Sequence, residues 1–127
     1  MKLVPAAILA ALAMAGPASA CAFGGVEMVR AELLFGRTAA PAAEWDDFLA
    51  HSVTPLFPDG LTVLDGQGQW LSPKTSTISH EASTVLLILA PPSPDLKARL
   101  DAVRENYKAR FHQQSVGLVT STSCVAF

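Results

Sequence analysis

The sequence predicts an α+β domain in which two helices cover one face of a four-stranded antiparallel sheet. Segments 27–37 and 78–90 have the alternating or continuously apolar patterns of strands. Segments 41–54 and 94–111 instead repeat apolar residues every three or four positions, which is typical of amphipathic helices. With two further strand-like segments at 61–71 and 115–127, the order is strand, helix, strand, strand, helix, strand.

The first strand and the first helix each have one apolar face. Alternate side chains of segment 27–37 are apolar, whereas Arg30 and Glu32 point the other way. Pro41 suits the first turn of a helix, and Pro55 ends that helix. The apolar stripe of the helix follows three- and four-residue spacings: Trp45, Phe48, Leu49, Ser52 and Val53.

The second strand contains glycines that need an interpretation. Residues 58–60, Pro-Asp-Gly, form a good turn, and segment 61–64 has the composition of a strand. We expect residues 65–68, Asp-Gly-Gln-Gly, to form a tight turn or bulge before the strand continues at 69–71. A phosphate cradle would need glycines that lead into a helix, and no helix follows them. The glycines therefore indicate turns of a sheet.

The third strand carries apolar residues on both of its sides. The run 85–89 is typical of a strand in the middle of a sheet. If the odd-numbered residues of this run face the helices, Thr84, Leu86 and Ile88 face outward. An apolar outward face suggests a partner, most simply a second copy of the chain in a homodimer. A bound ligand, or a cover formed by residues 65–77, are the alternatives.

The second helix is the most regular element of the sequence. Ser93 suits the N-cap, with Pro94 and Asp95 in the first turn. Its apolar positions recur at spacings of three and four: Leu96, Leu100, Val103, Tyr107 and Phe111. The last segment is rich in Val, Thr and Ser and contains no Pro, which favours a strand.

This order of elements predicts the ferredoxin-like split β-α-β fold (βαββαβ), with right-handed crossovers and the sheet order 4-1-3-2. In that order the last strand runs antiparallel to the first. The beginning of the first strand then lies beside the end of the last one. Cys21 and Cys124 occupy these two places, so the topology supports a disulfide between them.

Residues 1–20 are predicted to be a signal peptide. Lys2 precedes an apolar segment, and Ala18 and Ala20 fit a signal-peptidase site. The apolar segment of about 12 residues is shorter than the roughly 20 that a membrane-spanning helix needs. We therefore expect a single exported domain at 21–127, periplasmic or secreted, without a transmembrane segment. Lipidation of Cys21 is the alternative to the disulfide, although Ala18 stands where lipoboxes usually have Leu.

Composition and spacing exclude several classes of function. The chain has 9 Lys and Arg against 11 Asp and Glu, and no basic cluster, which argues against a nucleic-acid partner. His51, His80 and His112 lie on separate elements without metal-ligand spacing. We identify no catalytic pattern and no cofactor-binding motif. The expected partners are an envelope protein or a small ligand.

Several motifs resemble those of an uncharacterised family of small exported bacterial proteins, a domain of unknown function. They include LLFGRT, EWDDFL, FPDGLTVLDGQGQW and YKARFHQQSV. The resemblance implies a periplasmic or outer-surface location and a compact α+β domain, and it implies no activity. The motif positions are Phe57, Pro58, Asp59, Gly60, Gln69, Trp70, Glu81, Tyr107, Arg110, Phe111, Gln113 and Ser115.

Two candidate sites follow from these positions. The first is a polar cluster in which Arg110 forms an ion pair with Glu81 or Asp59 and thereby holds residues 57–60, the FPDG loop, against the second helix. Tyr107 and Gln113 lie on the same side of this helix as Arg110. The second is a pocket on the open sheet face.

The pocket would contain Arg30, Glu32 and His80 and belongs to the alternative function, a small dimeric enzyme of the α+β-barrel kind. The leading hypothesis is a non-catalytic binding module of the cell envelope. An enzyme needs an enclosed pocket with convergent titratable groups, whereas a binding module shows an exposed apolar patch.

Overall fold

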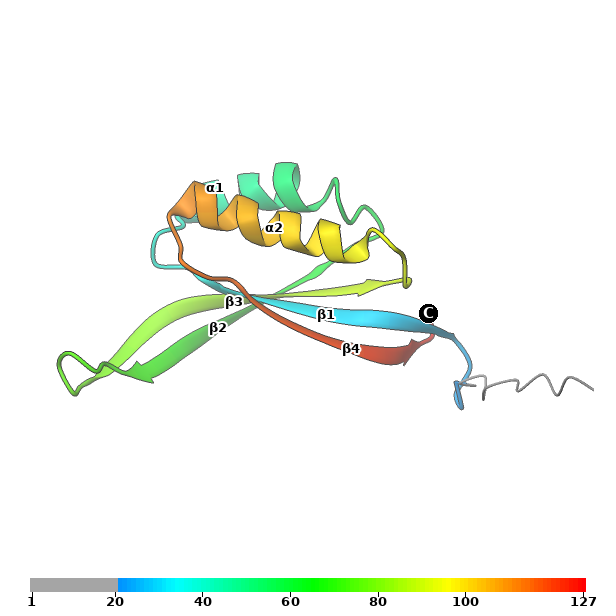
Figure 1. The fold of residues 1–127 in the computed structure, drawn as a ribbon, viewed down its shortest axis with the longest axis horizontal. Helices are drawn as coiled ribbons and strands as arrows, with labels where there is room; N and C mark the ends of the chain where they lie inside the picture. The colour runs from blue at the N-terminus through cyan, green and yellow to red at the C-terminus, as the bar shows by residue number, and fades with distance from the viewer. Residues whose placement is uncertain (1–20) are drawn as a thin grey trace, which may run out of the picture.

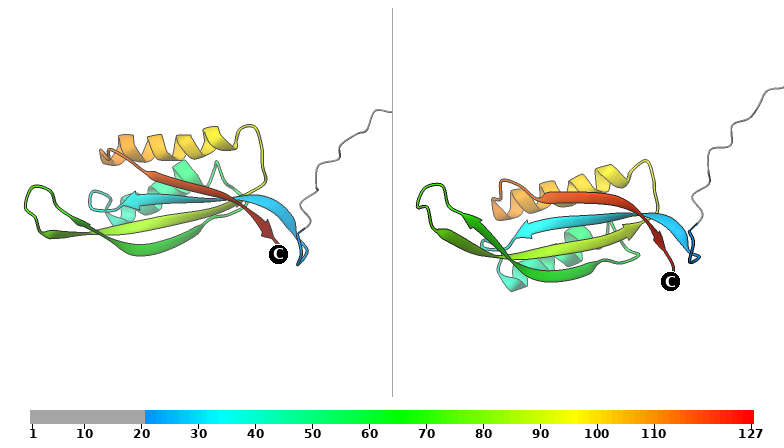
Figure 2. Two further views of the ribbon diagram at one scale, coloured as in Figure 1. Left: turned by 60° about the horizontal axis from the view of Figure 1, so that its bottom comes forward. Right: turned by 90° about the horizontal axis from the view of Figure 1, so that it is seen from below.

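The computed structural model describes residues 21–127, and the predicted signal peptide lies outside the described residues. One four-stranded antiparallel sheet, in the order β2-β3-β1-β4, carries both helices on one face (Figures 1 and 2). The predicted fold class and strand order are therefore confirmed. The elements are β1 (Val26–Gly36), α1 (Ala42–Phe48), the π-helical turn η1 (Leu49–Val53), β2 (Thr62–Leu71), β3 (Ile78–Ala90), α2 (Leu96–Phe111) and β4 (Gly117–Val125).

The core lies between the helices and one face of the sheet. Phe35 of β1 makes edge-to-face contacts with Trp45, Phe48 and Tyr107, and all four side chains are buried. Burial of each such aromatic stabilises the fold by about 1.5–3 kcal/mol. The apolar stripe predicted for α2 is the buried face of that helix. The stripe predicted for the first helix is buried at Trp45, Phe48 and Val53.

The orientation of β3 is the reverse of the one considered from the sequence. Thr84, Leu86 and Ile88 are buried and face the helices, whereas the odd-numbered residues of the run 85–89 lie on the open face. Leu86 pairs with the buried Leu33 of β1, so the register with β1 fixes which side of β3 points inward. Because both sides of β3 are apolar, its own pattern could not decide between them.

β2 is continuous, which overturns the predicted interruption at residues 65–68. Each residue from Thr62 to Leu71 has one partner on β3, and Gly66 and Gly68 are ordinary members of this ladder. The β2–β3 hairpin runs past the last pair of β1 and β3, Gly36 with Ser83, and projects beyond the helices (Figure 1). We call residues 67–82 the arm.

The ends of α2 differ slightly from the prediction. Asp95, not Ser93, is the N-cap residue, and the Ser93 hydroxyl donates a 2.7 Å hydrogen bond to the Asp95 carboxylate. At the other end His112 adopts the left-handed conformation, with φ 52°, and its backbone N–H closes the helix on the carbonyl of Lys108.

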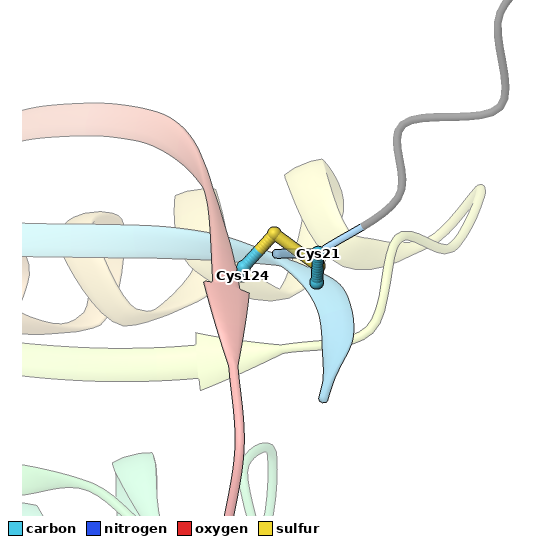
Figure 3. The surroundings of a disulfide bond; sticks show 2 residues. All are labelled: Cys21 and Cys124. Carbon is cyan, nitrogen blue, oxygen red and sulfur yellow. A yellow bond between two sulfur atoms is a disulfide. The ribbon is translucent and has the colours of Figure 1, made fainter. Parts of the chain in front are cut away.

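A disulfide joins Cys21 to Cys124, as the topology predicted (Figure 3). Their Cα atoms lie 5.5 Å apart, although 103 positions separate the two residues in sequence. Gly25 makes the approach possible, because its φ is +85° and a Cβ there would meet the carbonyl of Val125. A sulfur in this bond cannot carry a lipid thioether, so the disulfide and lipidation of Cys21 exclude each other.

Candidate functional site

Apolar side chains gather on the open face of the sheet, the face away from the helices. Leu34, Leu64 and Val119 are 44%, 50% and 55% exposed, and they come from β1, β2 and β4. The remaining members lie half-buried on β3: Val85, Leu87 and Leu89. We call these six residues the apolar patch. The predicted apolar open face is therefore present, formed by the other side of β3.

Arg30 and Glu32 also lie on this face and bind each other. The Nε of Arg30 donates a 2.8 Å hydrogen bond to Oε1 of Glu32, and their side chains are 48% and 32% exposed. Arg30 pairs with Leu89 and Glu32 with Leu87, which places the two charges within the apolar patch.

His80 does not join them, which corrects the predicted open-face pocket. It pairs with Gln69 in the arm, nine residues along β3 from Leu89, and such a stretch of strand spans about 30 Å. Because side chains alternate along a strand, His80 also lies on the opposite side of β3 from Glu81 and the apolar patch. The pocket of the enzyme hypothesis is therefore not assembled from its three residues.

The FPDG loop is held to α2 by Arg99, not by Arg110 as predicted. The Arg99 guanidinium lies 5.0 Å from the centroid of the Phe57 ring, and its Nη1 donates a 3.0 Å hydrogen bond to the carbonyl of Leu56. Its Nε is 3.0 Å from a carboxylate oxygen of Asp95 but is not directed at it, so that contact is an ion pair without a hydrogen bond. A hydrogen bond from the Ser93 hydroxyl lowers the pKa of Asp95.

Two shallow hollows flank the same loop. Asp59 and Gly60 line both of them. One, of about 240 Å³, is shared with Arg99 and the N-terminal end of α2. The other, of about 230 Å³, opens on the sheet face beside Leu87 and Phe127.

The prediction that Arg110 forms an ion pair with Glu81 or Asp59 is wrong. Nη1 of Arg110 donates a 2.8 Å hydrogen bond to Asp47 of α1, and this bond lowers the pKa of the Asp47 carboxyl. The physical reason is position along α2. Arg110 lies eleven residues beyond Arg99, about 16 Å along the helix axis, and therefore far from the FPDG loop.

The other members of the predicted polar cluster have separate partners. The Tyr107 hydroxyl donates to the carbonyl of Gly36, and burial raises the pKa of that hydroxyl. Oε1 of Glu81 accepts a 2.7 Å hydrogen bond from the hydroxyl of Thr38. The side-chain amide of Gln113 donates to the carbonyl of Phe111.

Glu81 and Gln113 nevertheless line one hollow, of about 570 Å³, between the arm and the connection from α2 to β4. Trp70, 47% exposed, forms its aromatic wall. Gly68 pairs with Glu81 and has no side chain, so the strand surface between Trp70 and Glu81 is bare. We call this the Trp70 hollow, and its full lining is Trp70, Glu81, His112, Gln113, Gln114 and Ser115.

The fold assembles a series of hydrogen-bonded side chains that the sequence did not lead us to expect. Arg37 Nη1 donates to the hydroxyl of Thr84, which donates to Asp65, each at 3.0 Å. The guanidinium lies 4.1 Å from the centroid of the Trp45 ring, and its Nε is buried without a hydrogen-bond partner. The one signal in the sequence was Thr84, a hydroxyl at the edge of an apolar strand.

The described residues show neither a membrane-spanning helix nor a group of metal ligands. No helix within residues 21–127 is long and apolar enough to cross a bilayer. Over the same range, no three His, Cys, Asp or Glu side chains are grouped so that they could hold a metal ion.

Comparison with models of protein families identifies the family to which the chain belongs. Residues 30–127 match the model of the family described as "Protein of unknown function (DUF3574)". The chain belongs to this family. The match covers most of the described domain, from β1 to the last residue, and the predicted membership of a family of unknown function is thereby confirmed. No curated protein matches the DUF3574 chain in sequence.

Solved structures share the fold at low sequence identity. A phage SAM lyase in complex with S-methyl-5'-thioadenosine is 13% identical, with a TM-score of 0.55, and the match covers 80% of this chain and 92% of the lyase. The same lyase in the apo state is 12% identical over the same shares, with a TM-score of 0.53. CutA from Synechococcus elongatus is 12% identical, with a TM-score of 0.50 and 76% and 78% covered. At these identities the likeness shows the fold alone.

Proposed function

We propose that this DUF3574 protein is an exported, non-catalytic binding module of the cell envelope, and that the Trp70 hollow holds a small ligand. One observation carries the proposal. Trp70 on β2, Glu81 on β3, and Gln113 and Ser115 before β4 are far apart in sequence but line one hollow. All four belong to the motifs by which the sequence resembles its family.

The lining favours an uncharged ligand with many hydroxyl groups and one apolar face, the chemistry of a sugar ring. An exposed indole offers a flat apolar surface for such a ring. Two side-chain amides and one hydroxyl can both donate and accept hydrogen bonds, while the Glu81 carboxylate accepts them. The hollow has no Lys or Arg in its lining, and the Glu81 carboxylate would repel an anionic ligand.

Export is supported by the disulfide. Bonds of this kind persist in oxidising compartments such as the periplasm and are rare in the cytosol. The predicted signal peptide at residues 1–20 fits the same location. A mass spectrum of the exported protein tests both, because cleavage after residue 20 and the loss of two hydrogen atoms when two thiols are oxidised to a disulfide each change the mass.

Tryptophan fluorescence tests the ligand site. The chain has two tryptophans, and Trp45 is buried, so Trp70 reports on the hollow. We expect glucose, N-acetylglucosamine or chitobiose to change the emission of the wild type but not that of Trp70→Phe. Gln113→Ala should weaken the binding of the active sugar by about 3- to 10-fold, the effect of one lost hydrogen bond.

Gln67→Ala is the matched control, because Gln67 is an exposed glutamine of the arm on the opposite side of β2. Its sugar binding should equal that of the wild type. The ligand site is wrong if none of these sugars binds, or if Gln67→Ala weakens binding as much as Gln113→Ala.

A further inference from the structure

We infer that the apolar patch on the open face of the sheet is covered in solution by a second copy of this chain. This inference goes beyond the proposed ligand site and does not depend on it. The patch crosses all four strands in three neighbouring rows. Leu64, Val85 and Leu34 form the first row, Leu87 and Val119 lie in the second on either side of Glu32, and Leu89 lies in the third beside Arg30. An exposed apolar surface of this extent marks an interface.

Glycines make this face flat enough for another sheet to approach. Gly117 pairs with Leu34 at the β4 end of the first row, and a Cβ there would lie 3.2 Å from the Leu34 side chain. In the row beyond, Gly66 and Gly36 both pair with Ser83, and the Glu81 carboxylate lies over Gly36. Two sheets that pack face to face lie about 10 Å apart, a spacing that leucine and valine side chains beside Gly66 and Gly117 permit.

The charges on this face favour a copy of the chain over a charged partner. Among the six residues of the patch lie one cation and one anion, Arg30 and Glu32, which bind each other. The surface of the patch is therefore neutral and offers no attraction to a strongly acidic or basic partner; Glu81 lies on the same side of the sheet but in the arm, outside the patch. A two-fold contact brings the same surface together from both subunits, so it needs a surface that does not repel itself. A neutral face of this kind meets that requirement.

The size of the face is also suitable. Four strands about 4.8 Å apart, with about nine paired residues at about 3.3 Å each, give a plane of roughly 19 by 30 Å. This projected area of roughly 570 Å² is comparable to the about 800 Å² that each partner buries in a stable complex, because side-chain relief adds to accessible area.

Native mass spectrometry and sedimentation of the disulfide-bonded protein test this inference. The wild type should contain two or more chains per particle. Leu34→Lys and Leu64→Lys should each give single chains, because a lysine cannot be buried there without a partner. Both residues are about half exposed in the single chain, so the fold should tolerate them, and circular dichroism checks that it does.

Leu71→Lys is the matched control. Leu71 is 67% exposed and lies on the opposite side of β2 from Leu64. This variant should retain the assembly of the wild type. A wild type that stays a single chain at its highest soluble concentration overturns the inference, as does a Leu71→Lys variant that dissociates when Leu34→Lys does not.

Reversing the charge of Arg30 or of Glu32 distinguishes self-association through this face from association through other surfaces. Arg30→Glu leaves two acidic residues on each patch, and Glu32→Arg leaves two basic ones. Each variant alone should lose the multi-chain species through like-charge repulsion, whereas a mixture of the two should form particles that contain both variants. Assembly of either variant alone at the wild-type level would place the contact elsewhere and contradict the inference.

Discussion

At the scale of single residues, the position of a side chain along its helix selects its partner. Arg99 and Arg110 are both cations of α2, yet one reaches the carbonyl of Leu56 and the other the carboxylate of Asp47. The two ends of α2 lie over different parts of the molecule. The FPDG loop therefore depends on Arg99, and the contact between α1 and α2 is made by Arg110.

The pair of Arg110 and Asp47 gives a prediction of pH dependence. The hydrogen bond from Arg110 holds the pKa of Asp47 below its ordinary value of 3.8 in the folded protein. A lowered folded pKa stabilises the fold above pH 3.8, and this stabilisation is lost as the pH falls through the folded pKa. Arg110→Gln should therefore unfold at lower urea concentration than the wild type at pH 7, and the difference should vanish in acid.

A double-mutant cycle with Asp47→Asn isolates this pair from His51, whose Nδ1 is 2.9 Å from the Asp47 carboxylate. The coupling between Arg110 and Asp47 should be favourable at pH 7 and absent below the folded pKa. A difference between Arg110→Gln and the wild type that is constant from pH 7 into acid would mean that the charge of Asp47 is not involved.

At the scale of elements, the aromatic cluster joins both helices to β1. Tyr107 of α2 lies 4.7 Å from Phe35 of β1 and 5.3 Å from Phe48 of α1, measured between ring centroids. Its hydroxyl also donates to the carbonyl of Gly36, the last residue of β1. Tyr107 therefore combines apolar packing with one hydrogen bond that fixes α2 relative to the end of β1.

Tyr107→Phe tests the hydrogen bond without removing the ring. We expect a loss of about 1–2 kcal/mol in the free energy of unfolding, because the Gly36 carbonyl loses the Tyr107 donor at a partly buried position. Burial raises the folded pKa of Tyr107 above its ordinary value of 10.0, so the stability of the wild type should decline as the pH rises beyond 10.

Urea unfolding at pH 7 and above pH 10 measures both effects. The phenylalanine variant should lose less stability between these two pH values than the wild type, since it has no hydroxyl to ionise. Equal stability of the two proteins at pH 7 would show that the hydrogen bond to Gly36 contributes nothing.

At the scale of the whole molecule, one covalent bond closes the fold at the edge of the sheet. The antiparallel pairing of β1 and β4 brings Glu27 opposite Cys124, and the turn through Gly25 returns Cys21 to the same place (Figure 3). The bond encloses almost the entire described chain. A long enclosed loop gives a disulfide its largest effect on the unfolded state.

Removing the disulfide should therefore destabilise the domain strongly. We expect the double variant Cys21→Ser, Cys124→Ser to lose about 2–5 kcal/mol in the free energy of unfolding, which lowers the melting temperature by roughly 10–20 °C. Thermal unfolding followed by circular dichroism measures this shift. Reductant should produce a similar shift in the wild type and none in the variant; an unchanged melting temperature would show that pairing of β1 and β4 alone holds the ends together.

The local pattern of the sequence could predict much of this architecture. The alternation in β1 and the three- and four-residue spacing in α2 identify these elements and their buried sides, because Arg30 and Glu32 mark the outward side of β1 and charged residues mark that of α2. The order of the elements then placed the ends of β1 and β4 together, and with them Cys21 and Cys124. Each of these inferences needs only periodicity, which is a property of neighbouring residues.

Contacts between distant segments decided the rest. β3 is apolar on both sides, so only its register with β1 determined that Leu86 faces the helices. β2 continues through Gly66 and Gly68 because β3 supplies hydrogen-bond partners that its own sequence does not reveal. Trp70 and Gln113 line one hollow because the arm and the α2–β4 connection lie together in three dimensions. The sequence by itself determined the elements and their order. The tertiary structure decided the register of the strands, which side of β3 faces the helices and which distant residues line one hollow, because these features arise from pairings between residues far apart in the chain.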